Sequence, residues 1–195
     1  VTIPEGKNLF EVAAILEQKK ICSKDDFIKV SKDLTFTSSL GIPSHRLEGY
    51  LYPDTYGLTK GMPAKDVARV MVSNFNRQIK GLNFSSSPNN LNKHQIIILA
   101  SIVEKETGAR EERPIIAGVY HNRLERKMRL YSDPTTIYGI WENWKGNLKK
   151  RHLQEKTAYN TYRISGLPKG PIANPGIAAI KATINPKKHN FTYFV

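Results

Sequence analysis

The sequence has a single cysteine, few acidic residues for its number of basic ones, and no long apolar run. Cys22 alone among 195 residues rules out an intramolecular disulfide framework. No segment offers the roughly 20 apolar residues that a membrane-spanning helix needs, and no signal peptide is recognisable. A chain of this length buries about 70% of the surface that its unfolded form exposes, so it can fold without disulfides or a structural metal.

Familiar catalytic and metal-binding motifs are also missing. The chain has no GxSxG turn, no Walker-type phosphate loop and no GxGxxG. Its five histidines are scattered, without metal-ligand spacing or cysteine partners. We therefore expect no metal and no cofactor, and the motif classes of serine hydrolases, P-loop NTPases and zinc hydrolases are disfavoured.

Basic residues outnumber acidic ones by 30 to 17, which gives a net charge of +13. Such a chain favours polyanionic partners, namely nucleic acid, anionic lipid headgroups or a cell-wall polymer that carries carboxylates. The alternative is that the excess Lys and Arg only keep the surface solvated. Nucleic acid is the least favoured partner, because the basic residues are dispersed and no RNP signature or zinc finger occurs.

The sequence predicts an α+β fold with a buried central helix and a loop-rich cleft. A strand end and a turn are expected at residues 3–7, and Asn8 and Ser23 are expected to cap two short helices. The Thr- and Ser-rich segment 33–44 is expected to be irregular, and we place a domain boundary after it. Helical periodicity fades between residues 131 and 175, where loops are expected to build a binding cleft. Four further helices are expected, at residues 63–80, 93–107, 113–125 and 175–184.

The segment 93–107 is expected to be a buried central helix that Gly108 ends in the left-handed conformation, because apolar residues cover nearly its whole circumference. Glu104 and Glu106 lie in its last turn and point about 160° apart, so they cannot act as a facing pair. Apolar surroundings and the negative end of the helix dipole destabilise a charged carboxylate, which suits a general acid. Alternatively, both glutamates form ion pairs with Lys105, Arg110 or Arg113, and the pattern alone does not choose.

Two segments are rich in tyrosine. Residues 47–56 contain three tyrosines and two acidic residues, and residues 158–162 place two tyrosines beside Asn160 and Thr161. Flat tyrosine rings stack on sugar rings, and amides pair with their hydroxyl and acetamido groups. Glycines and prolines after residue 165 fix the neighbouring loop backbone. A purely structural tyrosine cluster with rigid turns is the alternative.

Taken together, these segments resemble the YceG-like family of endolytic murein transglycosylases. The matching stretches occur in the expected order and are LEGYLYPDTY (47–56), LASIVEKET (99–107), AGVYHNRLERKMRLYSDPTTIYG (117–139), AYNTYRISGLPKGPIANPG (158–176) and the terminal strand FTYFV (191–195). The opening IPEGKNLFEVAAIL (3–16) resembles the family's small LysM-like unit. The resemblance implies a LysM-like subdomain over residues 1–44. A mixed α/β catalytic domain is implied over residues 45–195, truncated at its C-terminal end.

The resemblance also implies an activity and a location. The family cuts nascent peptidoglycan glycan strands internally, between MurNAc and GlcNAc, and leaves 1,6-anhydro-MurNAc ends. We expect one N-terminal helix, upstream of Val1, to anchor the protein in the bacterial inner membrane, with the catalytic part in the periplasm or otherwise outside the membrane. Peptidoglycan synthases are the expected partners. One carboxyl suffices, because the C6 hydroxyl of the sugar attacks in place of water.

The match to LASIVEKET implies that Glu104 is the essential glutamate, with Glu106 as the alternative. A peptidoglycan-binding module without catalysis and, less favoured, a nucleic-acid-binding protein are the rival interpretations. The acidic residue Glu48 and the aromatic residue Tyr50 are expected to contribute to the cleft. The main candidates for its wall are Asn122, Arg123, Asp133, Thr136, Tyr138, Tyr159, Asn160, Thr161 and Tyr162.

Overall fold

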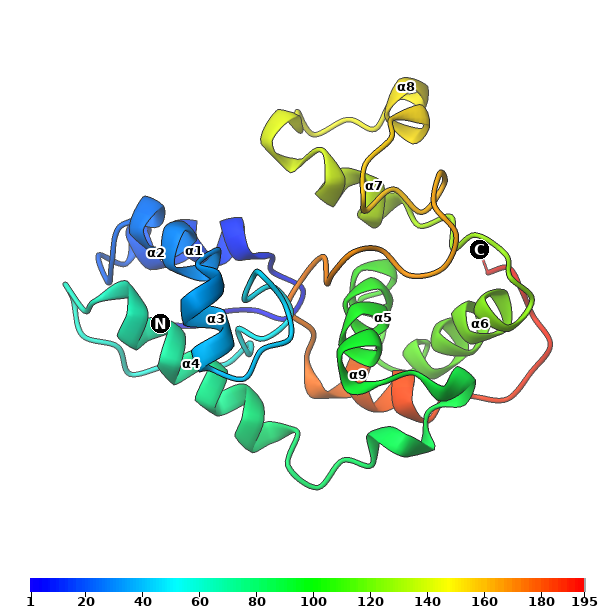
Figure 1. The fold of residues 1–195 in the computed structure, drawn as a ribbon, viewed down its shortest axis with the longest axis horizontal. Coiled ribbons are helices and arrows are strands. Elements are labelled where there is room, and N and C mark those ends of the chain that lie inside the picture. The colour runs from blue at the N-terminus through cyan, green and yellow to red at the C-terminus, as the bar shows by residue number, and fades with distance from the viewer. Residues whose placement is uncertain (195) are drawn as a thin grey trace. The chain divides into compact units, whose positions relative to one another are not determined.

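The computed structural model describes residues 1–194, and Val195, the last residue of the expected terminal strand, lies outside them. The described residues form helices joined by loops (Figure 1). Their β structure is one isolated antiparallel bridge between Thr2 and Thr55. Two backbone hydrogen bonds flank it, from Ile3 N to Asp54 O at 2.9 Å and from Tyr56 N to Val1 O at 2.8 Å. Among residues 1–194 the fold is therefore helix-rich, and the β part that we expected is reduced to this short pairing, which ends at the turn after Pro4.

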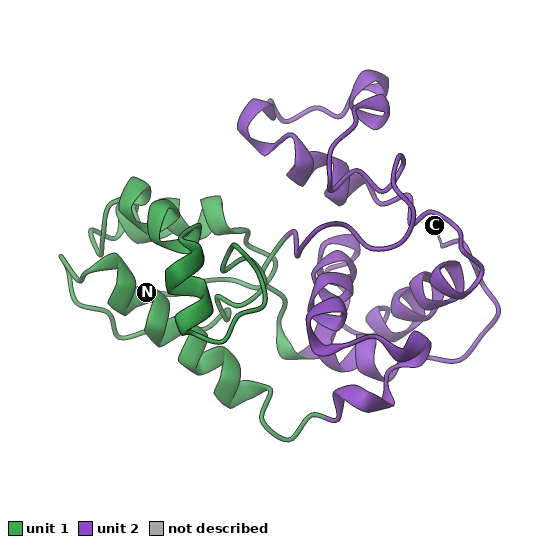
Figure 2. Ribbon diagram, viewed as in Figure 1, with its two compact units in different colours: residues 1–82, 173–177 green, residues 83–172, 178–195 purple. Residues whose placement is uncertain are grey.

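The chain packs into two compact units (Figure 2). Unit 1 comprises residues 1–82 and 173–177, and unit 2 comprises residues 83–172 and 178–195. These packing units have other bounds than the domains predicted over residues 1–44 and 45–195, and that domain boundary stays a prediction.

Unit 1 is built from α1 (Leu9–Gln18), α2 (Lys24–Ser31), α3 (Leu34–Ser39) and α4 (Ala64–Gln78), and α2 contacts the other three. The side chain of Asn8 accepts a hydrogen bond from Glu11 N, and the Glu11 side chain accepts one from Asn8 N. Ser23 caps α2 by accepting from Asp26 N. Both predicted N-caps are therefore confirmed, because each side chain satisfies backbone donors that the first helical turn leaves without partners.

The expectation that residues 33–44 are irregular was wrong. The Asp33 side chain accepts a hydrogen bond from Phe36 N and starts α3, and Phe36 is buried. The hydroxyls of Thr37 and Ser39 donate to backbone carbonyls three residues earlier. Ser and Thr usually compete with a helix for its backbone groups, but here their hydroxyls bond within the helix itself.

A returning segment completes unit 1. Asn174 Oδ1 accepts from the backbone N–H groups of Gly49 and Leu51, both at 2.9 Å, and Asn174 Nδ2 donates to Lys7 O at 2.9 Å. One side chain from late in the sequence thus fixes the loop around Gly49, whose φ of 89° is in the left-handed region that favours glycine.

Unit 2 is centred on α5 (Lys93–Glu106), which is buried from Ile96 to Glu104 and contacts α6 (Arg113–Glu125) and α7 (Asp133–Gly139). Asn92 and Gln95 form a capping box at the start of α5. All of α9 (Ile177–Ile184) except its first residue belongs to this unit. Its short helices are η1 (Phe84–Ser86), η2 (Pro88–Asn90), η3 (Trp141–Asn143) and α8 (Lys150–Gln154).

Some predicted boundaries in unit 2 are confirmed and others need correction. The bounds of α6 are as predicted, with Pro114 in its first turn. Gly108 does not adopt a left-handed conformation; α5 ends because Thr107 is extended (φ −144°, ψ 141°). Neither α7 nor α8 was expected, and residues 191–194 form no strand. None of the helices within residues 1–194 is both long and apolar enough to cross a membrane.

Candidate active site

The two glutamates at the end of α5 have different surroundings. Glu104 lies in the buried part of the helix, where its Oε1 accepts a hydrogen bond from Arg113 Nη2 at 2.7 Å. Each of these two side chains is only 4% exposed. Burial destabilises a carboxylate, whereas an arginine at this distance stabilises it. The pair joins the last turn of α5 to the first turn of α6, and it is one of the ion pairs that the sequence left open.

Glu106 is half-buried and contacts two hydroxyl groups. Its Oε1 accepts hydrogen bonds from Tyr120 Oη at 2.6 Å and from Ser132 Oγ at 2.5 Å. Hydrogen bonds to an ionised carboxylate are short and strong, and these two fix one carboxyl oxygen. No hydrogen-bond donor to Oε2 occurs among residues 1–194. Glu106 is thus a positioned carboxyl with one oxygen available for proton transfer.

Tyr120 and Ser132 are site residues that the sequence did not single out. Tyr120 lies seven residues after Arg113, so the two share one face of α6, and each contacts one of the glutamates. That seven-residue spacing is the signal that could have identified Tyr120. Ser132 carries no such signal, because a loop brings it to Glu106.

Buried hydroxyl groups hold the loop that carries Ser132. Ser132 N donates to Thr161 Oγ1 at 2.9 Å, and Thr135 Oγ1 donates to Ser132 O at 2.6 Å. Thr136 Oγ1 donates to Asn160 Oδ1 at 3.0 Å. Thr136, Asn160 and Thr161 are fully buried, so these three predicted cleft residues tie residues 132–136 to residues 157–162 rather than face solvent.

Two aromatic residues predicted for the cleft pack against each other inside unit 2. The rings of Tyr138 and Tyr159 meet edge to face, with centroids 4.8 Å apart, and both are buried. Asn160 Nδ2 closes the same region by donating to three backbone carbonyls, the shortest bond being 2.6 Å to Glu155 O. These contacts make the segment a packed scaffold for the loop.

Asp133 and Tyr162 lie on the more exposed side of the loop. Tyr162 Oη donates to Asp133 Oδ1 at 2.7 Å, and the Tyr162 ring packs against Tyr131 with centroids 5.5 Å apart. Partial burial, followed by the hydrogen bond and the charge of Asp133, raises the pKa of Tyr162, which therefore keeps its proton. Glu106 contributes to this shift as well, so Tyr162 is near enough to sense its charge.

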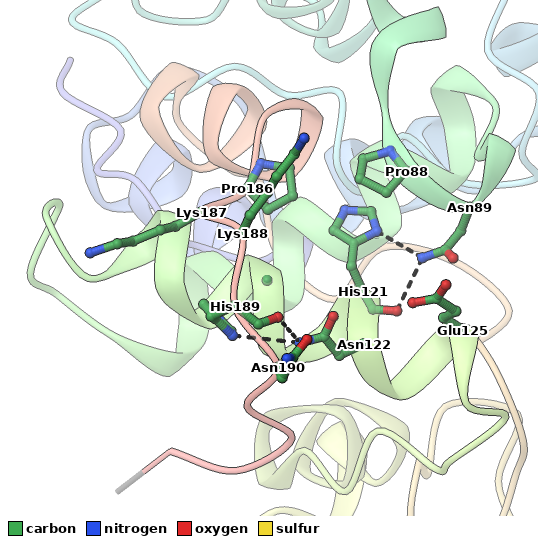
Figure 3. A pocket seen from close by; sticks show the side chains of 11 residues that line it. Pro88, Asn89, His121, Asn122, Glu125, Pro186, Lys187, Lys188, His189 and Asn190 are labelled. Carbon is green, nitrogen blue, oxygen red and sulfur yellow. Dashed lines mark hydrogen bonds between the residues drawn. The ribbon is translucent and has the colours of Figure 1, made fainter.

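Asn122 and Arg123 bind a segment of the chain itself. Asn122 Nδ2 donates to the backbone carbonyl of His189 at 2.8 Å (Figure 3). It donates to the backbone carbonyl of Phe191 at 2.8 Å as well. Arg123 Nε donates to Thr192 O at 2.7 Å. Asn122 also lines a pocket of about 270 Å³, together with His121, Glu125 and residues 186–190.

Glu48 and Tyr50 belong to the interior of unit 1. Both oxygens of Glu48 accept from Leu9 N, at 3.0 and 2.9 Å, at the N-terminus of α1, where a negative charge is stabilised by the helix dipole. Glu48 Oε1 also accepts from Asn174 Nδ2 at 3.0 Å. The Tyr50 ring packs against Phe75 with centroids 5.0 Å apart. Glu48 therefore binds the N-terminus of α1, and Tyr50 packs in the core of unit 1.

Comparisons with known proteins identify relatives over the whole chain. Residues 1–195 match the model of the YceG-like family. The chain is 31% identical over 210 residues to an endolytic murein transglycosylase of Bacillus subtilis (strain 168), covering 100% of this chain and 58% of that protein. An endolytic murein transglycosylase of Streptococcus pneumoniae (strain D39) is 31% identical over 224 residues, with 100% and 40% covered.

A solved structure agrees with these matches. The 2.6 Å crystal structure of a YceG-like protein from Listeria monocytogenes superposes with a TM-score of 0.88 at 32% identity. The superposition covers all of this chain and 68% of that one. The chain therefore spans 58% and 40% of the two curated relatives described, and about two thirds of the crystallised one.

Proposed function

Because the chain belongs to the YceG-like family, we propose that it carries the cutting site of an endolytic lytic transglycosylase that cleaves peptidoglycan glycan strands between MurNAc and GlcNAc. The curated relatives are named endolytic murein transglycosylases, and they match every part of this chain although it spans only part of their length. The observation that carries the proposal is the half-buried carboxyl of Glu106, fixed through one oxygen by two hydroxyls.

One carboxyl group can perform both proton transfers of such a cut. In its protonated form it donates to the glycosidic oxygen while the bond between that oxygen and C1 of MurNAc breaks. The resulting carboxylate then takes the proton of the C6 hydroxyl of the same MurNAc, whose oxygen bonds to C1. The products are a 1,6-anhydro-MurNAc end and a GlcNAc end with a restored hydroxyl, and no water is consumed. Hydrolytic glycosidases instead place a second carboxylate across the bond.

The contacts favour Glu106 over Glu104 as this carboxyl. Glu104, to which the resemblance points, is buried in an ion pair with Arg113 that supports a structural role. Glu106 is more exposed, and Oε2 is the oxygen that would meet the glycan. The assignment of Glu104 stays a prediction, and we carry it as the alternative.

Among the predicted cleft residues, Asp133 and Tyr162 are the best candidates for direct contact with sugar. They lie on the more exposed side of the loop, Tyr162 donates a hydrogen bond to Asp133, and the charge of Glu106 acts on Tyr162. We propose that Thr136, Tyr138, Tyr159, Asn160 and Thr161 shape this loop from inside. For Asn122, Arg123, Glu48 and Tyr50, the contacts described above favour roles in holding the fold.

The test is digestion of uncrosslinked glycan strands by the intact protein, with mass detection of anhydro ends. We expect Glu106→Gln to abolish their release while glycan binding is kept, because glutamine cannot donate and recover the proton. Glu104→Gln is the matched control, and we expect measurable activity in its folded fraction. Loss in Glu104→Gln with full activity in Glu106→Gln would move the role to Glu104. Full activity in both would exclude a mechanism that depends on either glutamate, and glycan binding without any cleavage by the wild type would leave a peptidoglycan-binding module without catalysis.

The remaining expectations concern the whole protein, and we propose them on the resemblance alone. They are a LysM-like role for residues 1–44, an anchor in the inner membrane, catalysis outside the cytoplasm, and peptidoglycan synthases as partners. Protease added to intact spheroplasts should degrade the region of residues 1–194 if it faces outward. Protection from the protease would contradict that location.

A further inference from the structure

A segment late in the chain lies along α6. We call residues 186–194 the strap; they follow α9 and are red in Figure 1. Lys187 N donates to Pro114 O at 2.9 Å, and His189 Nε2 lies 2.9 Å from Ile115 O. With the two hydrogen bonds from Asn122, these contacts hold the strap along α6 from its first turn onward (Figure 3).

Gly118 allows this close approach. A Cβ atom at this position would lie 2.5 Å from Lys187 O and 2.6 Å from His189 Nε2. The first of these neighbours is backbone, so a side chain at residue 118 would displace the strap. The strap can therefore dock on α6 in this way only because residue 118 is a glycine.

Arg123 connects the end of the strap to Tyr120. Its Nε donates to Thr192 O at 2.7 Å, and its Nη1 donates to Leu130 O. Its guanidinium carbon lies 5.2 Å from the ring centre of Tyr193, 5.7 Å from Tyr120 and 6.0 Å from Phe194. A guanidinium within about 6 Å of aromatic rings is attracted to them. Arg123 thereby holds three rings in one cluster.

Tyr120 is the member of this cluster that reaches Glu106. Its ring meets Phe194 edge to face, with centroids 5.8 Å apart, and its hydroxyl donates to Glu106 Oε1. Burial, followed by the charge and the hydrogen bond of Glu106, raises the pKa of Tyr120 well above its ordinary value. The hydroxyl therefore stays protonated and remains a donor to Glu106 over the physiological pH range.

We propose that the strap, Arg123 and Tyr120 form one positioning unit for Glu106, in which Tyr120 is the positioning residue. The inference rests on the proposed function, in which Glu106 gives and takes the proton. Tyr120 fixes Oε1, which leaves Oε2 for the glycosidic oxygen, and its hydrogen bond stabilises the carboxylate form. It thus affects the geometry of the proton transfer.

Tyr120→Phe tests this role, because it removes the hydroxyl and keeps the ring. We expect kcat for glycan cleavage to fall on the order of tenfold, as for loss of a hydrogen bond to a charged group. KM should stay unchanged, since Tyr120 does not touch the glycan.

Tyr56→Phe is the matched control. The Tyr56 hydroxyl donates to Tyr52 O at 2.6 Å and accepts from Asn74 Nδ2 at 3.1 Å, all within unit 1. This variant should unfold at a lower temperature, with the kcat and KM of the wild type. An unchanged kcat in Tyr120→Phe, or the same fall in kcat in Tyr56→Phe, would overturn the inference.

Gly118→Ala tests whether the strap acts through Tyr120. We expect it to lower kcat by itself and to lower it no further when combined with Tyr120→Phe. If Gly118→Ala does not fold, Arg123→Lys replaces it, because lysine keeps the charge but cannot bond Thr192 O and Leu130 O together. Fully additive losses would exclude a strap that acts through Tyr120. Glu106→Gln separates the two proposals: if it is inactive and Tyr120→Phe is normal, only the positioning unit fails.

Discussion

At the scale of single residues, Glu104 and Glu106 look alike in sequence and differ in their contacts. Removing the charge of Glu104 leaves the Arg113 guanidinium buried without its partner carboxylate, which costs about 3–5 kcal/mol for a buried pair. Within residues 1–194, the hydrogen-bond partners of the Glu106 carboxyl are neutral hydroxyls, so its replacement disturbs the fold less. The folded fraction of each variant therefore has to be measured before their activities are compared.

His121 gives a prediction about pH and stability. It is 4% exposed, its Nε2 lies 2.9 Å from Thr183 O, and its Nδ1 lies 3.0 Å from Asn89 Nδ2, a geometry that suits a neutral ring. Burial lowers the pKa of His121 below its ordinary value, and the hydrogen bond to Thr183 opposes that shift. Because the unfolded chain then binds more protons, the free energy of unfolding should fall as the pH drops below about 6.5.

The measurement is urea unfolding above and below that pH, for the wild type and for His121→Gln. The variant should lose less stability on acidification, because glutamine does not titrate. Burial also lowers the pKa of His94, so some pH dependence will remain. Equal slopes for the wild type and the variant would contradict the assignment to His121.

The glutamates could be found from the sequence, because a helix with apolar residues on all sides makes a late carboxyl conspicuous. Their partners could not. Tyr120 and Ser132 reach Glu106 only when α6 and the loop before α7 pack against α5. The burial of Thr136, Asn160 and Thr161 is likewise a result of tertiary packing, whereas their polar character had suggested a cleft wall.

At the scale of elements, helices with strong caps were predictable and short helices were not. The helices α1, α2 and α5 each begin at a predicted Asn or Ser cap, and α6 has Pro114 in its first turn. By contrast, α3, α7 and α8 have six, seven and five residues, so their apolar periodicity is too brief to recognise. Packing, rather than intrinsic propensity, stabilises helices of this length.

The N-cap of α3 gives a prediction about stability. Replacing Asp33 with alanine removes the hydrogen bond from Phe36 N, and we expect the free energy of unfolding to fall by about 1 kcal/mol. Asp25→Ala, an exposed acidic residue in the first turn of α2, is the control, with an expected loss of a few tenths of a kcal/mol at low salt. Equal effects in urea unfolding would show that Asp33 is not a cap.

At the scale of the whole molecule, the sequence predicted a family and an order of motifs but not the packing units. Unit 1 contains residues 173–177 because Asn174 bonds to the backbone of Lys7, Gly49 and Leu51. A contact across more than a hundred residues leaves no periodic signal in the sequence. The predicted boundary after residue 44 depends on local composition, so it could not include a segment that returns from so far along the chain.

The central claim is that one positioned carboxyl transfers the proton while the C6 hydroxyl of MurNAc attacks C1 of the same sugar and the glycosidic bond breaks. The most direct test is digestion of uncrosslinked glycan strands by the intact protein in ¹⁸O-labelled water, followed by mass spectrometry of the new MurNAc ends. We expect 1,6-anhydro ends that carry no label, because the C6 hydroxyl of the sugar, and not water, attacks C1. Reducing ends that carry ¹⁸O would show that the protein hydrolyses the strand, and they would contradict the account.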